Sequence, residues 1–444
     1  MRNRILGADW VVTQTGAPIE KGVIVVEGAK IAWVGREAGL PSQFARQTVD
    51  RFRGVITPGL VNAHTHLQYT GFAALGKRQF TSFEHWADEF EVEYLAVTSP
   101  DEWTRAAAQG VKLAINSGTT SLAEIITNDA ARGALAAHFA GGVEYLEVIS
   151  EIDRSWADGG RDAFLQRLAA PSQSQVGISP HAPYSVDPDV ITDLVRLAHD
   201  TDLRLHTHLG ESGFEDALYQ HGIPRVLDVF GDLRDEYVLV REGGRGMKAA
   251  VFADSIGLIC PRCHIAHGVY FDRAQRDLLL AQGTQVALCP RSNAVIGLDM
   301  APVADYLREG HEIAVGTDSL ASSPSLDLMA DVKELAVIAR AQGYDGADLF
   351  ARLIRAATVG GARAMGLAKG YGTLTRGGPA DIAAFAVAVP DGEVDRALVE
   401  GAEGKCVLTM AAGRVLFDAR QPQTFERTAP APGLCAVGNS NVQH

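Results

Sequence analysis

The chain has 444 residues, of which 47% are hydrophobic and 21% are charged, and its formal net charge is -14 at pH 7. This length and composition are typical of a globular protein with a barrel-sized core and a smaller second unit. The acidic charge excludes nucleic acid as an expected partner, because a phosphate-binding protein needs a basic face, and no apolar run reaches the ~18 residues of a membrane span.

The start of the chain and its cysteines indicate the compartment. Residues 1–4 lead into a strand-like pattern rather than into the apolar stretch of a secretory signal peptide. The five cysteines are few, scattered and odd in number, as in proteins of a reducing compartment. We therefore expect a cytoplasmic location.

Both ends of the chain carry short β-type segments. Residues 1–58 alternate strands and turns, with an expected hairpin over 22–35, and a similar pattern returns at 370–420. Because neither end can bury a core alone, we expect the two ends to meet in one small β-sandwich. Residues 421–444 have no apolar periodicity and predict a poorly ordered tail.

Residues 59–369 alternate apolar strands with helical stretches, which is the pattern of repeated βα units. The expected strands are residues 59–66, 119–126, 141–149, 175–183, 203–211, 263–269, 284–293 and 312–319. The expected helices are residues 104–117, 129–140, 188–201, 272–282 and 325–342, with Asp187 as the N-cap of the third. Eight such strands predict an α/β fold of the (β/α)8 barrel type, with its active site at the carboxyl ends of the strands. Residues 231–254 fit no unit and predict an insertion.

Ionisable side chains gather at these predicted strand ends. His64 and His66 end the first strand and, being two residues apart, point to the same face. Other strand ends carry His181, His206, His208, Glu211, His264, His267, Arg291, Ser292, Asn293 and Asp318. Burying so many unpaired groups at one rim would be costly, whereas a divalent metal ion would stabilise them.

Four motifs in chain order make the chain resemble a known superfamily. They are Pro58-Gly59-Leu60-Val61-Asn62-Ala63-His64-Thr65-His66, His208-x-x-Glu211, Ala266-His267-Gly268 and Gly316-Thr317-Asp318. With these motifs the chain resembles the amidohydrolase superfamily, and within it the deaminases of adenine nucleosides such as S-adenosylhomocysteine, methylthioadenosine and aminodeoxyfutalosine. Gly377-Gly378-Pro379-Ala380-Asp381-Ile382 resembles the return into the β-sandwich. The resemblance also implies that copies of the chain can associate as a homo-oligomer.

The resemblance assigns roles to individual residues. It implies that the metal ligands are His64, His66, His208 and Asp318. It further implies that Glu211 shuttles protons and that His267 orients the attacking water, with Asp318 accepting a proton from it. Three nitrogens and one carboxylate leave an open position for water, as in catalytic zinc sites, although iron suits the same ligands. The fourth predicted strand has no lysine to bridge two metals, so we expect a single divalent ion.

For other histidines and cysteines near these motifs we expect structural roles. His206 shares a face with His208, and we expect it to support a ligand or to fill the barrel. His264 is an odd number of residues from His267, which predicts opposite faces of one strand and a structural role for His264. Cys260 and Cys263 have metal-like spacing but no second pair, so they predict a loop.

The substrate site rests on weaker signals. His181 matches, by resemblance, a residue that contacts ribose hydroxyls, or else it is a loop histidine that shapes the pocket. Arg78, Arg154 and Arg291 are candidates to bind a substrate carboxylate, with surface ion pairs as the alternative. Ser292 and Asn293, beside Arg291, complete the expected substrate-binding set. Aromatic residues in the loop after the first strand predict either a lid or local packing, and these are Phe80, Phe83 and Trp86.

These signals together predict a metal-dependent hydrolytic deaminase of a nucleoside. An anion partner and an aromatic lid favour 6-amino-6-deoxyfutalosine, of menaquinone biosynthesis, as the substrate. One alternative is a broad deaminase of adenosine, S-adenosylhomocysteine and methylthioadenosine. A second alternative is a triazine or cyclic-amide hydrolase of the same superfamily.

Overall fold

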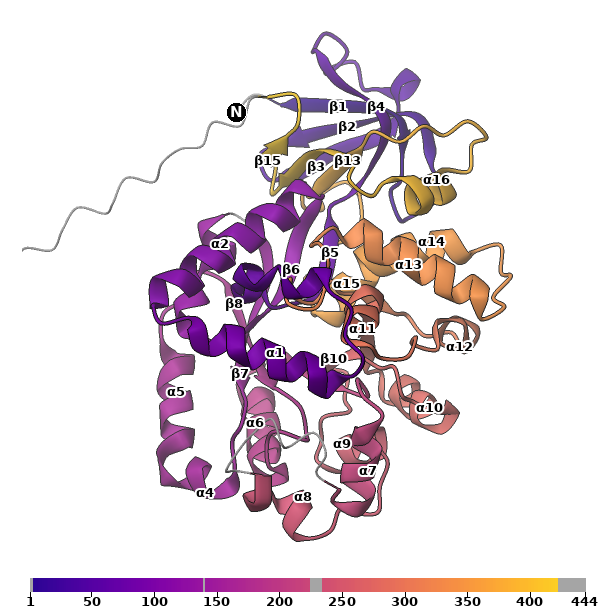
Figure 1. The fold of residues 1–444 in the computed structure, drawn as a ribbon. Helices are drawn as coiled ribbons and strands as arrows, with labels where there is room; N and C mark the ends of the chain where they lie inside the picture. Colours follow the sequence, from indigo (N-terminus) through magenta and orange to yellow (C-terminus); the bar gives the residue numbers. More distant parts are fainter. Residues whose placement is uncertain (1–2, 139, 224–233, 422–444) are drawn as a thin grey trace, which may run out of the picture.

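A computed structural model describes residues 3–138, 140–223 and 234–421 of the protein. Eight consecutive parallel strands form one curved sheet, each beside its neighbour in the chain (Figure 1). They are β5 (Leu60–Thr65), β6 (Thr119–Ile126), β7 (Gly141–Val148), β8 (Gln175–Pro180), β9 (Leu205–Leu209), β10 (Cys263–His267), β11 (Gln285–Leu288) and β12 (Ala314–Val315). The predicted (β/α)8 barrel is confirmed.

The seam between the first and last strands lies beside the predicted metal ligands. The backbone N–H of Asp318 donates to the carbonyl oxygen of His64 over 3.0 Å, and that of Thr317 donates to the Asn62 side-chain oxygen over 3.1 Å. The strand β12 is shorter than predicted because Asp318 takes a left-handed conformation with φ 58°. This turn places the Asp318 side chain at the barrel mouth.

A second sheet of seven strands joins the two ends of the chain. Its order is β15 (Arg414–Asp418), β14 (Cys406–Ala411), β13 (Ile382–Phe385), β4 (Val49–Pro58), β1 (Arg4–Val11), β2 (Ile19–Glu27) and β3 (Lys30–Arg36). The two ends therefore meet, as predicted, in a unit separate from the barrel, and the described strands of this unit form a single mixed sheet. Figure 1 shows this sheet above the barrel.

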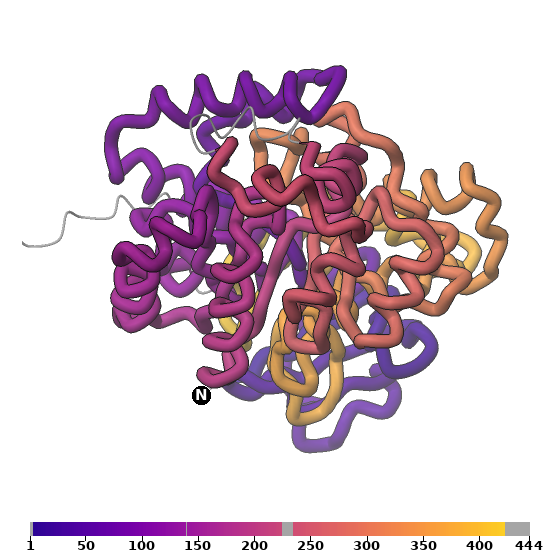
Figure 2. Tube along the Cα trace, turned by 90° about the horizontal axis from the view of Figure 1, so that it is seen from below, coloured from indigo at the N-terminus to yellow at the C-terminus, as the bar shows by residue number. Residues whose placement is uncertain are grey.

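Most of the helices lie around the barrel strands (Figure 2). Those that match predicted helices are α2 (Pro100–Asn116), α6 (Pro188–Asp200), α10 (Arg273–Gln282) and α13 (Leu328–Ala341). The others of more than four residues are α1 (Phe83–Ala96), α5 (Arg161–Ala169), α7 (Phe214–His221), α9 (Ala249–Ser255), α11 (Pro290–Ile296), α12 (Val303–Arg308), α14 (Leu349–Arg355) and α16 (Val394–Gly401). The shorter ones are α3 (Ala134–Ala137), α4 (Asp153–Ser155), α8 (Val238–Arg241) and α15 (Gly361–Ala364). No helix within the described ranges is both long and apolar enough to cross a bilayer.

Local chemistry explains where several helices begin. Asp272 and Asp327 accept hydrogen bonds from the backbone N–H groups of Gln275 and Met329, and so cap α10 and α13. Asp187 stands at the N-cap of α6, but its side chain does not cap that helix. Its carboxylate instead accepts hydrogen bonds from the N–H groups of Asp153 and Val238, over 3.1 and 2.9 Å.

One predicted helix differs from the structure, and two predicted segments lie partly outside the described residues. The helix predicted over 129–140 is only a turn and the short α3, because Gly133 interrupts it with φ 78°. The expected insertion at 231–254 contains α8 and α9, with residues 231–233 outside the described ranges. The predicted tail lies outside them as well, apart from Gln421.

Candidate metal and active site

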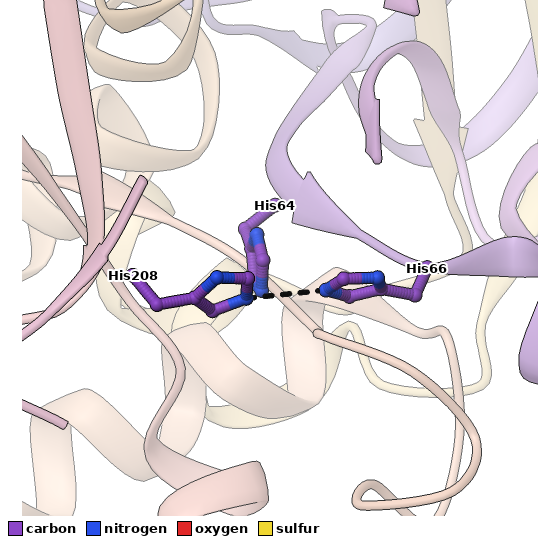
Figure 3. Close-up of side chains that lie close together, drawn as sticks. All are labelled: His64, His66 and His208. Atoms are coloured by element: carbon purple, nitrogen blue, oxygen red, sulfur yellow. Dashed lines mark hydrogen bonds between the residues drawn. The ribbon is translucent and has the colours of Figure 1, made fainter. Parts of the chain in front are cut away.

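Three histidines from two strands converge at the barrel mouth (Figure 3). His64 and His66 come from the end of β5, and His208 comes from β9. The Nε2 atoms of His66 and His208 lie 3.2 Å apart, and the three rings offer nitrogens that all lie within 4.8 Å of one another. Two nitrogens bound to one tetrahedral divalent cation lie roughly 3.3 Å apart, so the observed spacing suits shared coordination.

Hydrogen bonds around the rings fix which nitrogens face inward. His208 Nδ1 donates to the carbonyl oxygen of His181 over 2.8 Å, which leaves Nε2 as the free nitrogen. Burial, followed by the neighbouring histidines, lowers the pKa of His208 well below its usual value. Burial also lowers the pKa of His66 to about 4. Both rings are therefore neutral at neutral pH, the form that binds metals.

His64 is held from beneath by a chain of polar groups. Its Nδ1 lies 3.0 Å from His206 Nε2, and His206 Nδ1 lies 3.1 Å from the Ser179 hydroxyl. A β-carbon at Gly316 would lie 2.7 Å from His64 Cβ, so glycine is needed there for the two strands to approach. The ring is thereby fixed with Nε2 directed at the site.

The carboxylate of Asp318 completes the cluster. Its Oδ1 lies 3.6 Å from His64 Nε2, and its Oδ2 accepts a hydrogen bond of 2.7 Å from the Ser292 hydroxyl. His64 Nε2 and His66 Nδ1 are buried without a hydrogen-bond partner among the described residues, which is unusual for buried polar atoms. Three imidazoles and one carboxylate, with the unpartnered Nε2 of His64 directed at the site, fit a divalent metal ion.

Glu211 and His267 lie beside this cluster. Glu211 Oε1 is 3.4 Å from His267 Nε2, and His267 Nδ1 donates to the Asn293 side-chain oxygen over 3.0 Å. His267 Nε2 is therefore free to accept a hydrogen bond. Burial first, and the charge of Asp318 second, raise the pKa of Glu211 well above its usual value. A carboxyl group in this position can hold a proton at neutral pH and transfer it.

A second glutamate, which the sequence analysis missed, holds the segment that carries Glu211. Glu215 is 1% exposed and accepts hydrogen bonds of 2.7 to 3.1 Å from three consecutive backbone N–H groups, those of Gly210, Glu211 and Ser212. Burial raises its pKa to about 7, although these N–H groups oppose the shift. Its position at the start of a helix four residues after Glu211 was the only sequence signal.

These groups open into a cavity of about 310 Å³. His66, His181, His208, Glu211, His267 and Asp318 line it on the metal side. Its other walls are largely aromatic and consist of Tyr69, Phe83, Trp86, Phe90, Tyr94 and Tyr184. Two further acids, Glu91 and Glu147, also line the cavity, whereas no lysine or arginine does so among the described residues. The cavity therefore suits a flat, largely apolar molecule with a few polar groups.

His181 lies in the cavity wall as expected for a substrate-binding residue. Its Nδ1 is 2.6 Å from the Ser185 hydroxyl, and burial lowers its pKa to about 3. Phe83 and Trp86 also line the cavity, in α1, while Phe80 is buried outside it. The lid interpretation thus suits Phe83 and Trp86, and local packing suits Phe80.

The three candidate arginines do not reach the cavity. Arg291 turns away and pairs with the buried carboxylate of Asp331 over 2.7 Å. Arg78 pairs with Glu89 over 3.0 Å, and Arg154 pairs with Glu236 over 2.7 Å. The observed pairs match the ion-pair alternative, and binding of a substrate carboxylate by these arginines stays a prediction that this geometry does not support.

Two other expected substrate contacts have different surroundings. Ser292 donates to Asp318 and Asn293 accepts from His267, and neither lines the cavity. Both side chains therefore position functional groups rather than contact the cavity.

The histidines behind the site also depart in part from the prediction. His206 supports His64, in line with its expected role. His264 was expected on the opposite face from His267, but both face the barrel interior. The ring of His264 lies 4.9 Å from that of His206, while His267 turns inward because its φ is 76°. The cysteines at 260 and 263 form no disulfide.

Comparison with a family model decides the classification. Residues 55–416 match the model described as the Amidohydrolase family. The chain belongs to the amidohydrolase family. This amidohydrolase is 28% identical over 445 residues to a "5-methylthioadenosine/S-adenosylhomocysteine deaminase" of Moorella thermoacetica, with 94% of each chain covered.

Solved structures share the fold of this amidohydrolase. A zinc-bound adenosine deaminase from Xanthomonas campestris matches with a TM-score of 0.77 at 23% identity, over 94% of this chain and 93% of the other. An atrazine chlorohydrolase from Arthrobacter aurescens with zinc matches with a TM-score of 0.77 at 20% identity, over 94% and 96%. The aminofutalosine deaminase of Helicobacter pylori matches with a TM-score of 0.75 at 18% identity, over 93% and 100%. At these identities the similarity establishes the fold.

Proposed function

We propose that this amidohydrolase is a metal-dependent hydrolytic deaminase of an adenine nucleoside. The observation that carries the proposal is the buried carboxyl group of Glu211, 3.4 Å from His267 Nε2, at the metal end of an aromatic cavity. His64, His66, His208 and Asp318 would hold one divalent cation. We propose zinc, for which three nitrogens and a carboxylate are common ligands, with iron as the alternative.

Each residue has a distinct task in the proposed reaction. The cation, when bound, supplies Lewis acidity that makes a water molecule easier to deprotonate. His267 Nε2, whose ring is fixed through Asn293, accepts a hydrogen bond from that water and orients it toward the amino-bearing carbon of the purine. The Asp318 carboxylate accepts its proton. Glu211 donates a proton to the adjacent ring nitrogen and takes up the proton of the added hydroxyl group as the carbonyl forms. It delivers that proton to the departing ammonia, and the proton held by Asp318 then restores Glu211 to its starting form.

We further propose 6-amino-6-deoxyfutalosine as the preferred substrate. The aromatic walls of Phe83, Trp86, Phe90 and Tyr94 would pack against its benzoyl ring, because aromatic surfaces attract one another in offset or edge-on arrangements. Its carboxylate finds no cationic partner among the described lining residues, so it would have to stay hydrated at the mouth of the cavity. The prediction of an arginine partner is therefore no part of this proposal.

Methylthioadenosine is the second candidate substrate. Its 5′ group is neutral and apolar, which suits walls without lysine or arginine. The name of the Moorella relative, which covers 94% of this chain, supports the same candidate. The predicted cytoplasmic location and homo-oligomer stay predictions.

A substrate panel tests the proposal. Ammonia release by the zinc-loaded protein is measured with aminodeoxyfutalosine, methylthioadenosine, S-adenosylhomocysteine and adenosine. We expect kcat/KM to be highest for aminodeoxyfutalosine. The kcat/KM of an uncharged analogue that lacks the carboxylate should lie within about tenfold of that value. Highest activity with methylthioadenosine would transfer the assignment to that substrate. No ammonia from any adenine nucleoside, but chloride or amine release from a triazine, would overturn the deaminase assignment.

The Glu211→Gln variant provides the mechanistic control. It should lose activity by about 10³-fold or more, because an amide cannot transfer protons, while it keeps its metal content. A variant that keeps both metal and activity would contradict the acid–base role.

A further inference from the structure

Glu147 is a buried acid in the cavity wall that the proposed reaction does not use. It lies near the end of β7, is 4% exposed and lines the cavity. Its Oε2 accepts a hydrogen bond of 2.5 Å from the Thr127 hydroxyl. Its Oε1 is buried and has no hydrogen-bond partner among the described residues. Buried carboxylate oxygens are normally paired, so this atom points to a missing donor.

Neighbouring side chains determine which group donates in the hydrogen bond between Thr127 and Glu147. The Thr127 oxygen lies 2.7 Å from the Gln68 amide nitrogen and 3.0 Å from the Tyr69 hydroxyl, both of which donate to it. The single proton of Thr127 is therefore available for Glu147 Oε2. Because that oxygen is occupied, Oε1 is the atom left for a ligand.

A second unused acceptor lies close by on His181. The Ser185 hydroxyl donates its proton to the Ala182 carbonyl over 3.2 Å, so it accepts a hydrogen bond from His181 Nδ1 over 2.6 Å. The free nitrogen of His181 is then an acceptor. One nitrogen of His181 and one carboxylate oxygen of Glu147 lie within 4.8 Å of each other, which is the reach of two neighbouring donors on one ligand.

We propose that Glu147 Oε1 and the free nitrogen of His181 accept hydrogen bonds from two adjacent hydroxyl groups of the substrate ribose. Glu147 then determines the preference for ribonucleosides over deoxynucleosides. This inference rests on the proposed deaminase function and adds a specificity residue to it. Burial raises the pKa of Glu147 to about 7, which fits a carboxylate whose desolvation no protein donor fully offsets.

The Glu147→Gln substitution tests this assignment. Thr127 donates to the side chain, so the amide oxygen would face Thr127 and the amide NH2 would face the ribose. The variant would thus present a donor where the hydroxyl needs an acceptor. We expect binding of the ribonucleoside to weaken by about 10- to 100-fold, because a hydrogen bond to a charged group is lost.

Glu144, on the same strand, supplies a matched control. It is also fully buried, and one of its oxygens has no hydrogen-bond partner in the part of the chain that the structure describes. Its other oxygen accepts hydrogen bonds from the Gly133 N–H and the Ser174 hydroxyl, and it lies outside the cavity. Glu144→Gln removes a buried charge in the same way but should leave ribose discrimination unchanged. Melting temperatures of both variants show whether either has lost its fold.

Binding and turnover are measured with adenosine, 2′-deoxyadenosine and 3′-deoxyadenosine. Calorimetry measures the dissociation constants without turnover, on the zinc-loaded Glu211→Gln variant and on the double variant that also carries Glu147→Gln. The kinetic constants kcat and KM are measured on wild-type protein and on the Glu147→Gln variant, both of which retain Glu211. In protein that retains Glu147, at least one deoxynucleoside should bind about 10- to 100-fold more weakly than adenosine, and Glu147→Gln should remove that difference.

The outcomes separate this inference from the proposed function. Deamination of nucleosides with the same ribose discrimination in Glu147→Gln and wild type would overturn the role of Glu147 and leave the function intact. Failure of all three nucleosides and of aminodeoxyfutalosine to bind would overturn both. A second tightly bound zinc per chain that disappears in Glu147→Gln would assign this pair of acceptors to a metal and overturn the inference.

Discussion

The Nε2 atoms of His66 and His208 lie 3.2 Å apart inside the barrel mouth, within reach of one cation. A divalent ion bound only by the folded protein should stabilise it by about 4 kcal/mol when its free concentration is 1,000 times its Kd. Removal of the ion with a chelator should therefore lower the melting temperature by several degrees, and added zinc should restore it.

The variant His66→Ala should lose the metal, as measured by elemental analysis. The exposed His199 is the matched control, since its side chain is 81% exposed and it lies far along α6 from the cluster. Equal melting temperatures with and without chelator, together with full metal content in His66→Ala, would contradict the site.

Glu215→Gln should slow turnover without removing the metal. The carboxylate of Glu215 accepts hydrogen bonds from three backbone N–H groups. In the amide, the NH2 group would face at least one of these N–H groups and could not accept from it, so the segment that carries Glu211 would be held less firmly. We expect kcat to fall about 10- to 100-fold with little change in KM, because Glu215 positions Glu211 and does not line the cavity.

Hydrogen exchange of residues 210–212 gives a readout that does not depend on the substrate, and it should speed up in Glu215→Gln. Asp187→Asn is the control, because Asp187 also joins two backbone N–H groups from other segments but holds no part of the Glu211 turn. If Glu215→Gln kept a normal kcat while hydrogen exchange of residues 210–212 became faster, Glu215 would not be needed to position Glu211.

Arg291→Leu should destabilise the protein and leave substrate affinity unchanged. The carboxylate of Asp331 is fully buried and would lose its cationic partner, at a cost of about 3 to 5 kcal/mol. Urea denaturation measures the loss, and Asp331→Leu in the same chain should recover most of it. A large rise in KM for a carboxylate-bearing substrate, without loss of stability, would show that Arg291 binds the substrate.

Asp381→Asn should change how stability depends on pH. Burial raises the pKa of Asp381 to about 6, although the N–H of Ala412 opposes the shift. The unfolded value is about 3.9, so between about pH 4 and pH 6 the folded chain binds this proton more tightly. The free energy of unfolding contributed by this group therefore falls as pH rises through that window.

The asparagine variant should lack this part of the decline, which amounts to about 3 kcal/mol at most. Urea denaturation of both proteins at about pH 4.5 and pH 7.5 measures the difference. Parallel changes in the two proteins would show that the Asp381 carboxyl group does not contribute.

Two candidate metal ligands could be predicted from the sequence because strand geometry is regular, whereas His208 and Asp318 rested on the family resemblance. His64 and His66 share a face through the two-residue period of a strand. The same rule failed for His264 and His267, because His267, the last residue of β10, departs from regular strand conformation with φ 76°. Regular periods predict side-chain direction only while the backbone stays regular.

Residues whose partners are distant in sequence could not be placed in this way. For Arg291 both a substrate carboxylate and an ion pair were open, and no local sign in the sequence showed that its partner is Asp331, 40 positions later. No prediction was made for Glu147 and Glu215, since their burial depends on how helices and loops close over the strand ends. Secondary-structure propensity and residue spacing do not show how helices and loops cover the strand ends.

The pairing of β4 with β13 has a consequence during synthesis of the chain. Pro58 faces Ile382 and Val55 faces Phe385 across this pair, so one strand leaves the ribosome roughly 300 residues before the other, or about 15 to 60 s earlier at usual rates. During that interval β4 presents an unpaired apolar edge of the kind on which chains aggregate. The nascent chain therefore has a long period in which a chaperone that covers this edge would raise the yield of folded protein.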